Sequence, residues 1–291
     1  MLPAHEIFER ERSRLLSIAY GLLGSLAEAQ DVVQDAYLRF ESADVAALRQ
    51  PAAWLTTVVS RLALDLLRSA RRRREVYPGE WLPEPVFDAP LQEQRQITRS
   101  RLSIALLHLL ETLGPEERAV FVLREVFERS YAEIAEIVGK SAAACRQAMT
   151  RARQRIAAQA PATPAPPDLA EQFLAALDAG DEHALMQLLA PDAVLYGDGG
   201  GKALAVVNPV FGAERIVRFY LGLRRKYGDR FDRRPSVVNG EPGLIALLDG
   251  AMNSVTALAW RDGRITALYN VLNPDKLHSS TGSQSSVAYS R

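Results

Sequence analysis

The chain has 291 residues, 48% of them hydrophobic and 24% charged, and its 35 basic residues balance its 35 acidic ones, which is typical of a soluble protein with two or three compact domains. No run of about 18 apolar residues is available to span a bilayer, and the first residues lack the basic and then apolar pattern of a secretory signal, so we expect a cytoplasmic protein that binds no membrane. The one cysteine, Cys145, excludes an intramolecular disulfide framework and a cysteine-rich zinc site.

Residues 1–74 are predicted to form an all-α domain, because apolar residues recur at helical spacing and no strand-like alternation interrupts them. Gly24 ends the first helix, and residues 25–28 have the form of a capping box at the start of the second. Pro51 suits the first turn of a third helix. The basic run 71–74 at its end suits either a solvated surface or contacts with phosphates.

Segments rich in proline divide the remaining chain. Residues 75–97 carry prolines that cannot continue a helix and are predicted to be an extended linker. A second all-α block follows over 98–160, and the Pro/Ala stretch 161–167 separates it from the rest as a semi-rigid spacer. Residues 168–277 are predicted to form an α+β domain. The serine-rich tail 278–291 has few apolar residues and is expected to be disordered.

The C-terminal domain is predicted to combine helices with a β-rich end. Asp262-Gly263 lies between two apolar, strand-like runs and is a strong signal for a two-residue hairpin. The expected elements are, in chain order, helices over 169–179 and 182–189, a strand over 193–196, a helix over 213–226, and strands over 255–260 and 265–271.

The second all-α block contains the pattern of a helix-turn-helix. Residues 130–138 are predicted to be a short helix, followed by a turn at Gly139 and a serine N-cap at Ser141. In the next helix one apolar stripe faces the core: Cys145, Met149, Ala152 and Ile156. The opposite face offers small and hydrogen-bonding side chains for base edges, namely Ala143, Arg146, Gln147, Thr150 and Arg151, with Arg153 placed for phosphates. The alternative is an ordinary amphipathic helical hairpin.

Residues 31–40, 53–68 and 113–124 resemble segments of RNA polymerase sigma factors. Residues 113–124, Leu-Gly-Pro-Glu-Glu-Arg-Ala-Val-Phe-Val-Leu-Arg, resemble the start of sigma region 4. Residues 31–40 resemble region 2.2, and residues 53–68 resemble regions 2.3 and 2.4. The resemblance implies that the chain binds core RNA polymerase, at the β′ clamp helices and the β flap, and binds promoter DNA. Region 4 is then expected to read the minus-thirty-five element and region 2 the minus-ten element.

The resemblance also implies roles for single residues in region 2. Asp31, Gln34 and Asp35 are the candidates for the clamp contact, although acidic residues in a first helical turn also suit the helix dipole. Arg61 and Arg68 are the candidates for DNA, but Asp65 and Arg68 also have the spacing of a helical ion pair. The sequence departs from many members at Leu62, where they have asparagine. Trp54 suits either the core or stacking on a flipped base.

Three short strings, at residues 81–85, 198–202 and 273–277, resemble those of the SigJ-like subgroup of extracytoplasmic-function sigma factors. Its members carry a SnoaL-like C-terminal domain with a curved sheet, which implies a fused regulator in place of a separate anti-sigma factor. We expect Trp81 to anchor the linker in an apolar slot and the other strings to contact the linker or region 2. The strings supply these interdomain candidates: Trp81 and Pro83; Asp198, Gly199, Gly200, Gly201 and Lys202; and Asn273, Pro274, Asp275, Lys276 and Leu277.

The fold class is therefore predicted to be multidomain, with two all-α domains that bind polymerase and DNA, followed by a SnoaL-like α+β domain. No metal or other cofactor is implied, and an unidentified small molecule in the SnoaL-like cavity is a candidate ligand. Two rival functions stay open. One is a regulator that binds DNA without polymerase, and the other is a cyclase-like enzyme using Asp198, Asp249 or His183.

Overall fold

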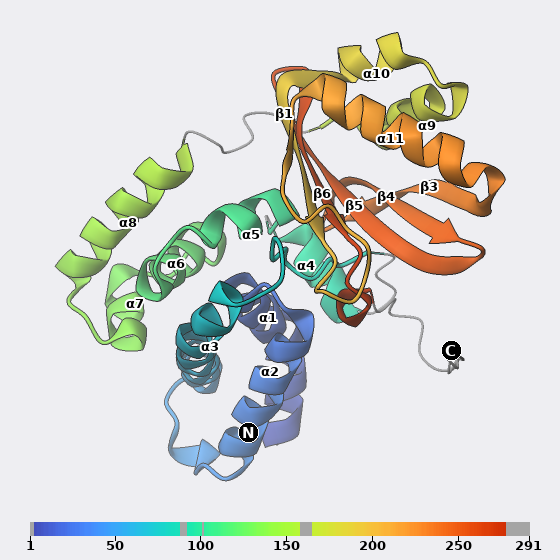
Figure 1. Cartoon of the computed structure of the whole chain (residues 1–291). Coiled ribbons are helices and arrows are strands. Elements are labelled where there is room, and N and C mark those ends of the chain that lie inside the picture. Colours follow the sequence, from blue (N-terminus) through green and yellow to red (C-terminus); the bar gives the residue numbers. More distant parts are fainter. Residues whose placement is uncertain (1–2, 88–91, 101, 158–164, 278–291) are drawn as a thin grey trace.

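A computed structural model describes residues 3–87, 92–100, 102–157 and 165–277 of the chain. The predicted tail, 278–291, lies outside the described residues. Figure 1 shows two groups of helices and a curved sheet that carries helices of its own. Within the described part, no helix combines the length and the apolar character needed to cross a bilayer.

The N-terminal helices follow the sequence prediction. They are α1 (Ala4–Leu23), α2 (Leu26–Glu41), the single 3-10 turn Val45–Ala47 and α3 (Pro51–Glu75). Gly24 ends α1 in the left-handed region with φ 70°, where glycine bears no steric penalty. The Ser25 side chain accepts from the Glu28 amide at 3.3 Å. The carboxylate of the linker residue Glu84 also binds this helix start, because its Oε2 accepts from the Leu26 amide at 2.8 Å.

The second helical group begins earlier than expected. Its elements are α4 (Gln92–Arg99), α5 (Ile104–Leu110), α6 (Pro115–Phe121), the π-turn Val122–Val126, α7 (Tyr131–Val138) and α8 (Ala142–Ala157). The predicted linker 75–97 therefore overlaps α4, because the last of its prolines precedes Gln92 and nothing after it opposes a helix.

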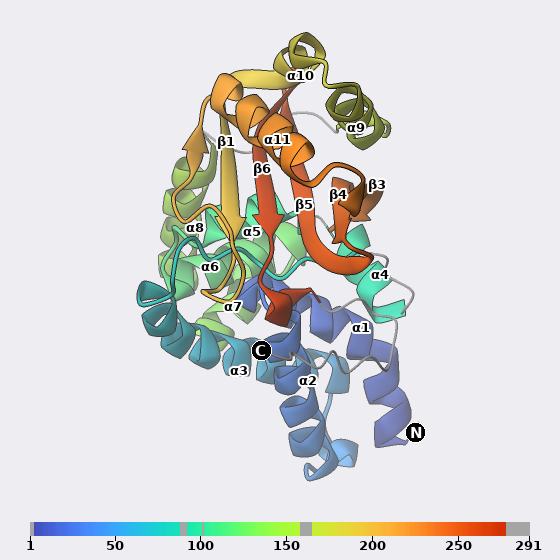
Figure 2. The same cartoon turned by 45° about the vertical axis from the view of Figure 1, so that its right-hand side comes forward.

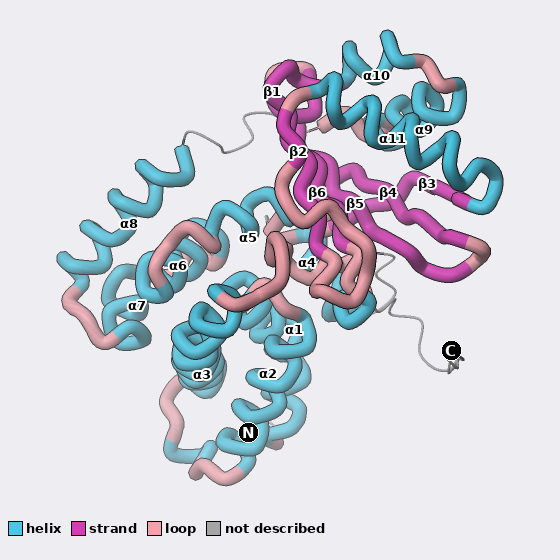
Figure 3. The backbone as a smooth tube through the Cα atoms, viewed as in Figure 1, coloured by secondary structure: helices cyan, strands magenta, loops and turns pink. Residues whose placement is uncertain are grey.

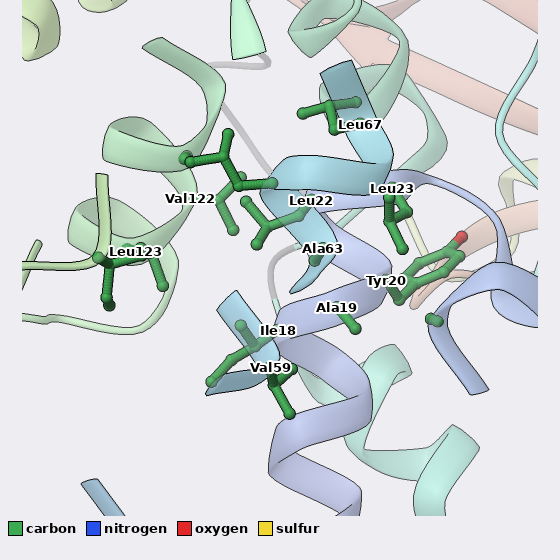
Figure 4. Close-up of a cluster of buried hydrophobic side chains, with 14 of the residues drawn as sticks. Ile18, Ala19, Tyr20, Leu22, Leu23, Val59, Ala63, Leu67, Val122 and Leu123 are labelled. Atoms are coloured by element: carbon green, nitrogen blue, oxygen red, sulfur yellow. The ribbon is translucent and has the colours of Figure 1, made fainter. Parts of the chain in front are cut away.

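The two helical groups share one hydrophobic core. Val122 and Leu123 of the π-turn are fully buried with Ile18 and Leu22 of α1 (Figure 4). Gly21 permits this close contact, because a Cβ at that position would lie 3.0 Å from Val122 Cγ1. The groups are therefore packed against each other rather than held apart by the linker.

The C-terminal domain is a six-stranded sheet of order β2-β1-β6-β5-β4-β3. Only the β1 and β6 pair is parallel among the pairs of the described sheet. Asp262 and Gly263, with φ 51° and 82°, turn β5 into β6, which confirms the predicted hairpin. Its elements are α9 (Leu169–Ala179), α10 (Glu182–Leu188), β1 (Leu189–Asp198), β2 (Val210–Phe211), α11 (Ala213–Tyr227), β3 (Phe231–Val238), β4 (Glu241–Leu248), β5 (Ala251–Arg261) and β6 (Arg264–Val271).

The two faces of the sheet have different neighbours. Helices α9, α10 and α11 cover one face, and Figure 2 shows α11 crossing β1, β6 and β5. The other face packs on the linker and on α5, through Leu82, Phe87 and Ile104. Figure 3 shows the connecting loops gathered between α1, α5 and the lower ends of β1 and β6. The sheet domain is thus built onto the helical groups through the linker.

Candidate functional sites

The α7 and α8 pair has the helix-turn-helix form that the sequence predicts. Ser130 and Glu133 make a capping box at the start of α7, and Gly139 ends that helix with φ 69°. Ser141 Oγ accepts from the Ala144 amide at 3.1 Å and so caps α8. The expected apolar stripe of α8 is buried: Cys145, Met149, Ala152 and Ile156.

The opposite face of α8 is exposed to solvent. It presents all six predicted residues, which are Ala143, Arg146, Gln147, Thr150, Arg151 and Arg153. Gln154 lies on the same face, four residues beyond Thr150, and sequence reasoning missed it. This row of amides, arginines and small side chains has the chemistry needed to read base edges.

Glutamates of the same domain form ion pairs with several of these arginines. Glu117 accepts from Arg151 Nε at 2.9 Å and from Arg155 Nη1 at 2.8 Å, and Glu125 pairs with Arg153. The three arginine side chains are more than half exposed. Exposed ion pairs contribute little to stability, so phosphates can replace these carboxylates.

The exposed face of α2 carries the residues predicted to contact polymerase. Asp31, Gln34 and Asp35 point away from the core that Val32, Val33, Ala36 and Phe40 form. Leu38 continues the same face one turn later, and 55% of its surface is exposed. Sequence reasoning missed Leu38, although its spacing of three and four residues from Asp35 and Gln34 was the available signal. The result is an acidic face that ends in an exposed apolar residue.

Helix α3 is in direct contact with the second helical group. Arg61 Nη2 donates to the Glu136 carbonyl at 2.7 Å, and Arg68 Nη2 lies 2.9 Å from Glu116 Oε1. Arg68 also pairs with Asp65 at 2.9 Å, as the alternative interpretation expected. Both arginines predicted to bind DNA are therefore engaged by protein groups in this arrangement.

Trp54 and the arginine run 71–74 each had two possible roles in the sequence. The Trp54 ring is half-buried and packs 5.7 Å from the Phe40 ring, which favours its core role. Arg74 is turned inward, where it pairs with Glu111 and donates to the Leu23 carbonyl at 2.5 Å. It is therefore neither part of a solvated surface nor in a position to bind phosphates, the two roles that the sequence suggested. The side chains of residues 71–73 lie outside the described ones.

Trp81 is held between two cations rather than in the apolar slot that the sequence suggested. The Arg74 guanidinium carbon lies 3.5 Å from the centroid of its ring, and Lys276 Nζ lies 4.2 Å from it. Desolvated cation and ring pairs of this kind contribute about 2 kcal/mol. The linker tryptophan therefore joins α3 to the C-terminal end of the described chain. Trp81 does anchor the linker, but no local pattern in the sequence signalled the Lys276 contact, because Lys276 comes from a segment distant in sequence.

Asp198 is the centre of a buried polar cluster that joins the sheet domain to the linker. Its carboxylate has no exposed surface and accepts from Lys276 Nζ at 2.7 Å, from the Tyr77 hydroxyl at 2.7 Å and from the Leu82 amide at 2.9 Å. Lys276 Nζ also donates to the Leu82 carbonyl at 2.6 Å. Burial lowers the pKa of Lys276, opposed by Asp198. We call Asp198, Tyr77, Leu82 and Lys276 the Asp198 cluster.

The glycines beside Asp198 leave room for its neighbours. A Cβ on Gly200 would lie 2.3 Å from Asn273 Nδ2, and one on Gly199 would lie 2.3 Å from the Ala203 carbonyl oxygen. Gly201, with φ 70°, faces Pro78. The Asn273 side chain in turn donates to the Tyr77 hydroxyl at 2.8 Å.

The other residues of the three strings surround this cluster. Lys202 and Asp275 form an exposed ion pair, and Pro274 begins the 3-10 turn that carries Lys276. Leu277 packs on the core shared by the linker and the sheet, and Pro83 is buried. The structure therefore brings all three strings together.

Asn239 forms a second junction, which sequence reasoning missed. This buried residue turns β3 into β4 with φ 52°. Its Oδ1 accepts from the Val86 amide at 2.8 Å, while its Nδ2 donates to the Tyr20 hydroxyl at 2.8 Å and the Leu102 carbonyl at 2.9 Å. One side chain thus bonds α1, the linker and the segment before α5. The Asn239-Gly240 dipeptide signals only a hairpin turn.

His108 of α5 lies against the sheet. Its ring packs on Tyr196 and Tyr269, at 4.8 and 5.2 Å between centroids, and its Nε2 lies 3.8 Å from Glu80. Burial lowers the pKa of His108 to about 4, opposed by the nearby Glu111. The histidine is therefore neutral when the sheet is docked at neutral pH.

The docked arrangement is expected to weaken on acidification. When the sheet is released, His108 takes up a proton near its ordinary pKa of 6.5, whereas docked His108 takes one up only near pH 4. The stabilising contribution of neutral His108 to docking is therefore complete above pH 6.5 and is lost as the pH falls towards 4. This difference corresponds to about 3 kcal/mol, and the raised pKa of Glu80 offsets part of it. Urea unfolding between pH 7.5 and 4.5 measures the slope of the free energy of unfolding against pH.

His108→Phe keeps the ring stacking and should remove this part of the slope. His183→Phe is the control, because His183 is exposed on α10. An unchanged slope in His108→Phe would show that the histidine does not couple docking to pH.

The residues of the rival enzyme hypothesis do not come together. Asp198 is enclosed in its cluster, Asp249 pairs with Arg230 in an exposed turn, and His183 is exposed on α10. None of them lines the cavity between α11 and the sheet. The arrangement thus offers these groups no shared substrate site.

Comparisons with known proteins agree on the family. Residues 7–73 match the sigma-70 region 2 model, and residues 103–156 match the sigma-70 region 4 model. The chain is 43% identical to the ECF RNA polymerase sigma factor SigJ of Mycobacterium tuberculosis, over 92% of this chain and 91% of that protein. It is 32% identical to the probable ECF RNA polymerase sigma factor SigI of the same species, over 94% and 95%.

A solved structure extends the likeness to the whole fold. The crystal structure of the M. tuberculosis extracytoplasmic function sigma factor SigJ superposes with a TM-score of 0.79 at 38% identity. The match covers 93% of this chain and 97% of that one, so it includes the sheet domain.

Proposed function

Because this chain belongs to the extracytoplasmic-function family of RNA polymerase sigma factors, we propose that its SnoaL-like domain regulates it in cis by holding regions 2 and 4 closed. The chain is an alternative sigma factor that binds core RNA polymerase and directs promoter recognition. Proteins of this kind regulate transcription and are not enzymes. We propose further that it acts in the cytoplasm.

The engagement of Arg61 and Arg68 by region 4 carries the proposal. The minus-ten and minus-thirty-five elements lie about 25 base pairs apart, which is roughly 85 Å along the duplex at 3.4 Å per base pair. Arg68 of region 2 is in contact with Glu116 of region 4, however. The two regions must therefore separate before both elements can be read, and the closed arrangement is a holding state.

Contacts of the SnoaL-like domain support its proposed role in stabilising this holding state. The Asp198 cluster fixes the linker, and Asn239 bonds Tyr20 of region 2 and Leu102 before α5. Each contact is lost when the regions separate along the linker. A fused domain that binds only the closed form lowers the population of the open form by mass action.

The proposed contacts with polymerase use the remaining exposed surfaces. We assign the α2 face of Asp31, Gln34, Asp35 and Leu38 to the β′ clamp helices and region 4 to the β flap. Within the described residues, the sheet domain packs on the linker and α5, and none of the α2 face residues belongs to that cluster. Core polymerase can therefore engage region 2 before the chain opens.

Run-off transcription with core polymerase and a pool of promoters tests the proposal. We expect the full chain and a form ending at residue 160 to initiate only with core enzyme, and the shorter form to initiate more often, because nothing holds it closed. Equal or lower initiation by a folded shorter form contradicts the holding role. Footprints by the chain alone, without initiation, contradict the proposed mode of DNA binding.

The exposed face of α8 is expected to carry minus-thirty-five recognition. Arg146→Ala or Arg151→Ala should weaken initiation by about 1 to 3 kcal/mol per lost base contact, or roughly 5- to 150-fold. Promoter titrations in run-off assays measure this loss. Arg218→Ala, which removes an exposed arginine of α11, is the control. Unchanged initiation by both α8 variants would remove them from the recognition surface.

A further inference from the structure

The SnoaL-like domain encloses a cavity that the sigma-factor role does not use. The cavity lies between α11 and the sheet and has a volume of about 340 Å³, which is within the range of small-molecule sites. Most of its wall is apolar, with Phe219, Leu223, Leu244 and Leu272 among the lining residues. The loop after the glycines, through Leu204 and Val206, forms another part of the wall.

One polar group in the wall lacks a partner. Arg233 of β3 has a buried Nη2 atom without a hydrogen-bond partner among the described residues. The buried Tyr220 hydroxyl of α11, on the same wall, interacts with Thr256, which in turn donates its hydroxyl to Asn270 at 3.0 Å. Buried polar groups are almost always paired in native proteins. The unpaired Arg233 atom on this cavity therefore indicates a missing partner.

The charge of the wall specifies what that partner is. Arg233 and Lys226 line the cavity, but no aspartate or glutamate does. Burial lowers the pKa of the Arg233 guanidinium, with Asp178 opposing it and Arg224 adding to it. The guanidinium carbon of Arg233 lies 4.3 Å from the centroid of the Phe231 ring. A half-buried guanidinium that has no ion-pair partner among the described residues favours a bound anion.

We propose that this cavity binds a carboxylate with an apolar body, which the Arg233 guanidinium and the Tyr220 hydroxyl hold by its carboxylate group. The apolar walls accommodate the body of the ligand. Ligand binding at this site involves none of the surfaces assigned to polymerase or promoter DNA.

The cavity is linked directly to the Asp198 cluster. Leu272 lines the cavity, and its amide donates to the Asp198 carbonyl at 2.7 Å. Ala203, at the other side of the wall, directly follows Lys202. A ligand that displaces either wall segment therefore moves a residue bonded to, or adjoining, the interdomain contacts. Ligand binding itself does not depend on the proposed holding role.

Calorimetric titration of the full chain tests the site. The probes are decanoate and 4-phenylbutyrate, with decanol as a body without charge and acetate as a charge without a body. We expect binding of at least one carboxylate probe, and binding of decanol or acetate that is at least tenfold weaker. Equal binding of decanol and decanoate, or no binding of either carboxylate probe at millimolar concentration, overturns the proposal.

Neighbouring arginines on β3 supply a matched pair of variants. Arg233→Met should weaken carboxylate binding at least tenfold, whereas Arg234→Met should not, because Arg234 is exposed on the opposite face of the strand. Unliganded Arg233→Met should melt no lower than the unchanged chain, since it removes a half-buried charge whose Nη2 atom has no partner among the described residues. Loss of stability without loss of binding overturns the ligand role. Run-off assays with the same probes then test the link to transcription separately.

Discussion

Replacing Asp198 by asparagine is expected to destabilise the docked SnoaL-like domain by about 3 to 5 kcal/mol, which is the usual cost of leaving a buried charge without its partner. The substitution preserves the shape of the side chain but removes the negative charge beside Lys276, whose ammonium group lies 2.7 Å away. Lys276 cannot turn to solvent without leaving the Trp81 ring and the Leu82 carbonyl. The docked state therefore retains an unpaired buried cation.

Urea unfolding and small-angle scattering measure this effect. Asp198→Asn should lower the free energy of unfolding and raise the radius of gyration, and it should increase promoter-dependent initiation with core polymerase. Asp275→Asn is the matched control, because it makes the same substitution in a lysine pair that is exposed. We expect it to change stability by less than about 1 kcal/mol. A variant as stable and as compact as the control would rule out the Asp198 cluster as an interdomain contact.

A double substitution separates the lost charge pair from general damage to the core. Lys276→Met combined with Asp198→Asn removes both charges, and replacing a whole buried pair by uncharged groups costs less than breaking it. The double variant should therefore be more stable than Asp198→Asn alone. A fully additive loss would mean that the two side chains act independently.

The segments of this protein that follow local rules could be predicted from the sequence. The helix of the DNA-reading face, its buried stripe and the Asp262-Gly263 hairpin depend on periodicity and turn chemistry within a few residues. The three strings could be assigned to interdomain contact by resemblance. Contacts between distant segments could not be predicted in the same way, because no local pattern specifies which partner a polar side chain finds.

Arg74 and Asn239 illustrate this limit. Arg74 ends a run of four arginines, and only the fold shows that it stacks on Trp81 and pairs with Glu111. Asn239 looks like a turn residue because its backbone is one, with φ 52°. Its side chain gains a second role only because the β3 and β4 hairpin reaches the junction of region 2, the linker and region 4. Both residues act between domains.

Asn239→Gly is expected to loosen this junction by about 3 kcal/mol, because the Val86 amide and the Leu102 carbonyl lose a buried hydrogen-bond partner that typically counts for 1 to 3 kcal/mol each. Glycine accepts the positive φ of this position without strain, so the loss reports the side chain alone. Asp262→Gly is the control, since Asp262 has φ 51° in an exposed hairpin of the same sheet.

Hydrogen exchange and transcription together identify which part of the protein responds. Asn239→Gly should speed exchange in the linker around Val86 and in the segment around Leu102, leave the α9 to α11 core of the SnoaL-like domain protected, and raise initiation with core polymerase. Faster exchange throughout that domain would instead mean that Asn239 supports only its own hairpin. Unchanged initiation despite a loosened linker would separate docking from the holding role, because the proposal requires both to change in the same direction.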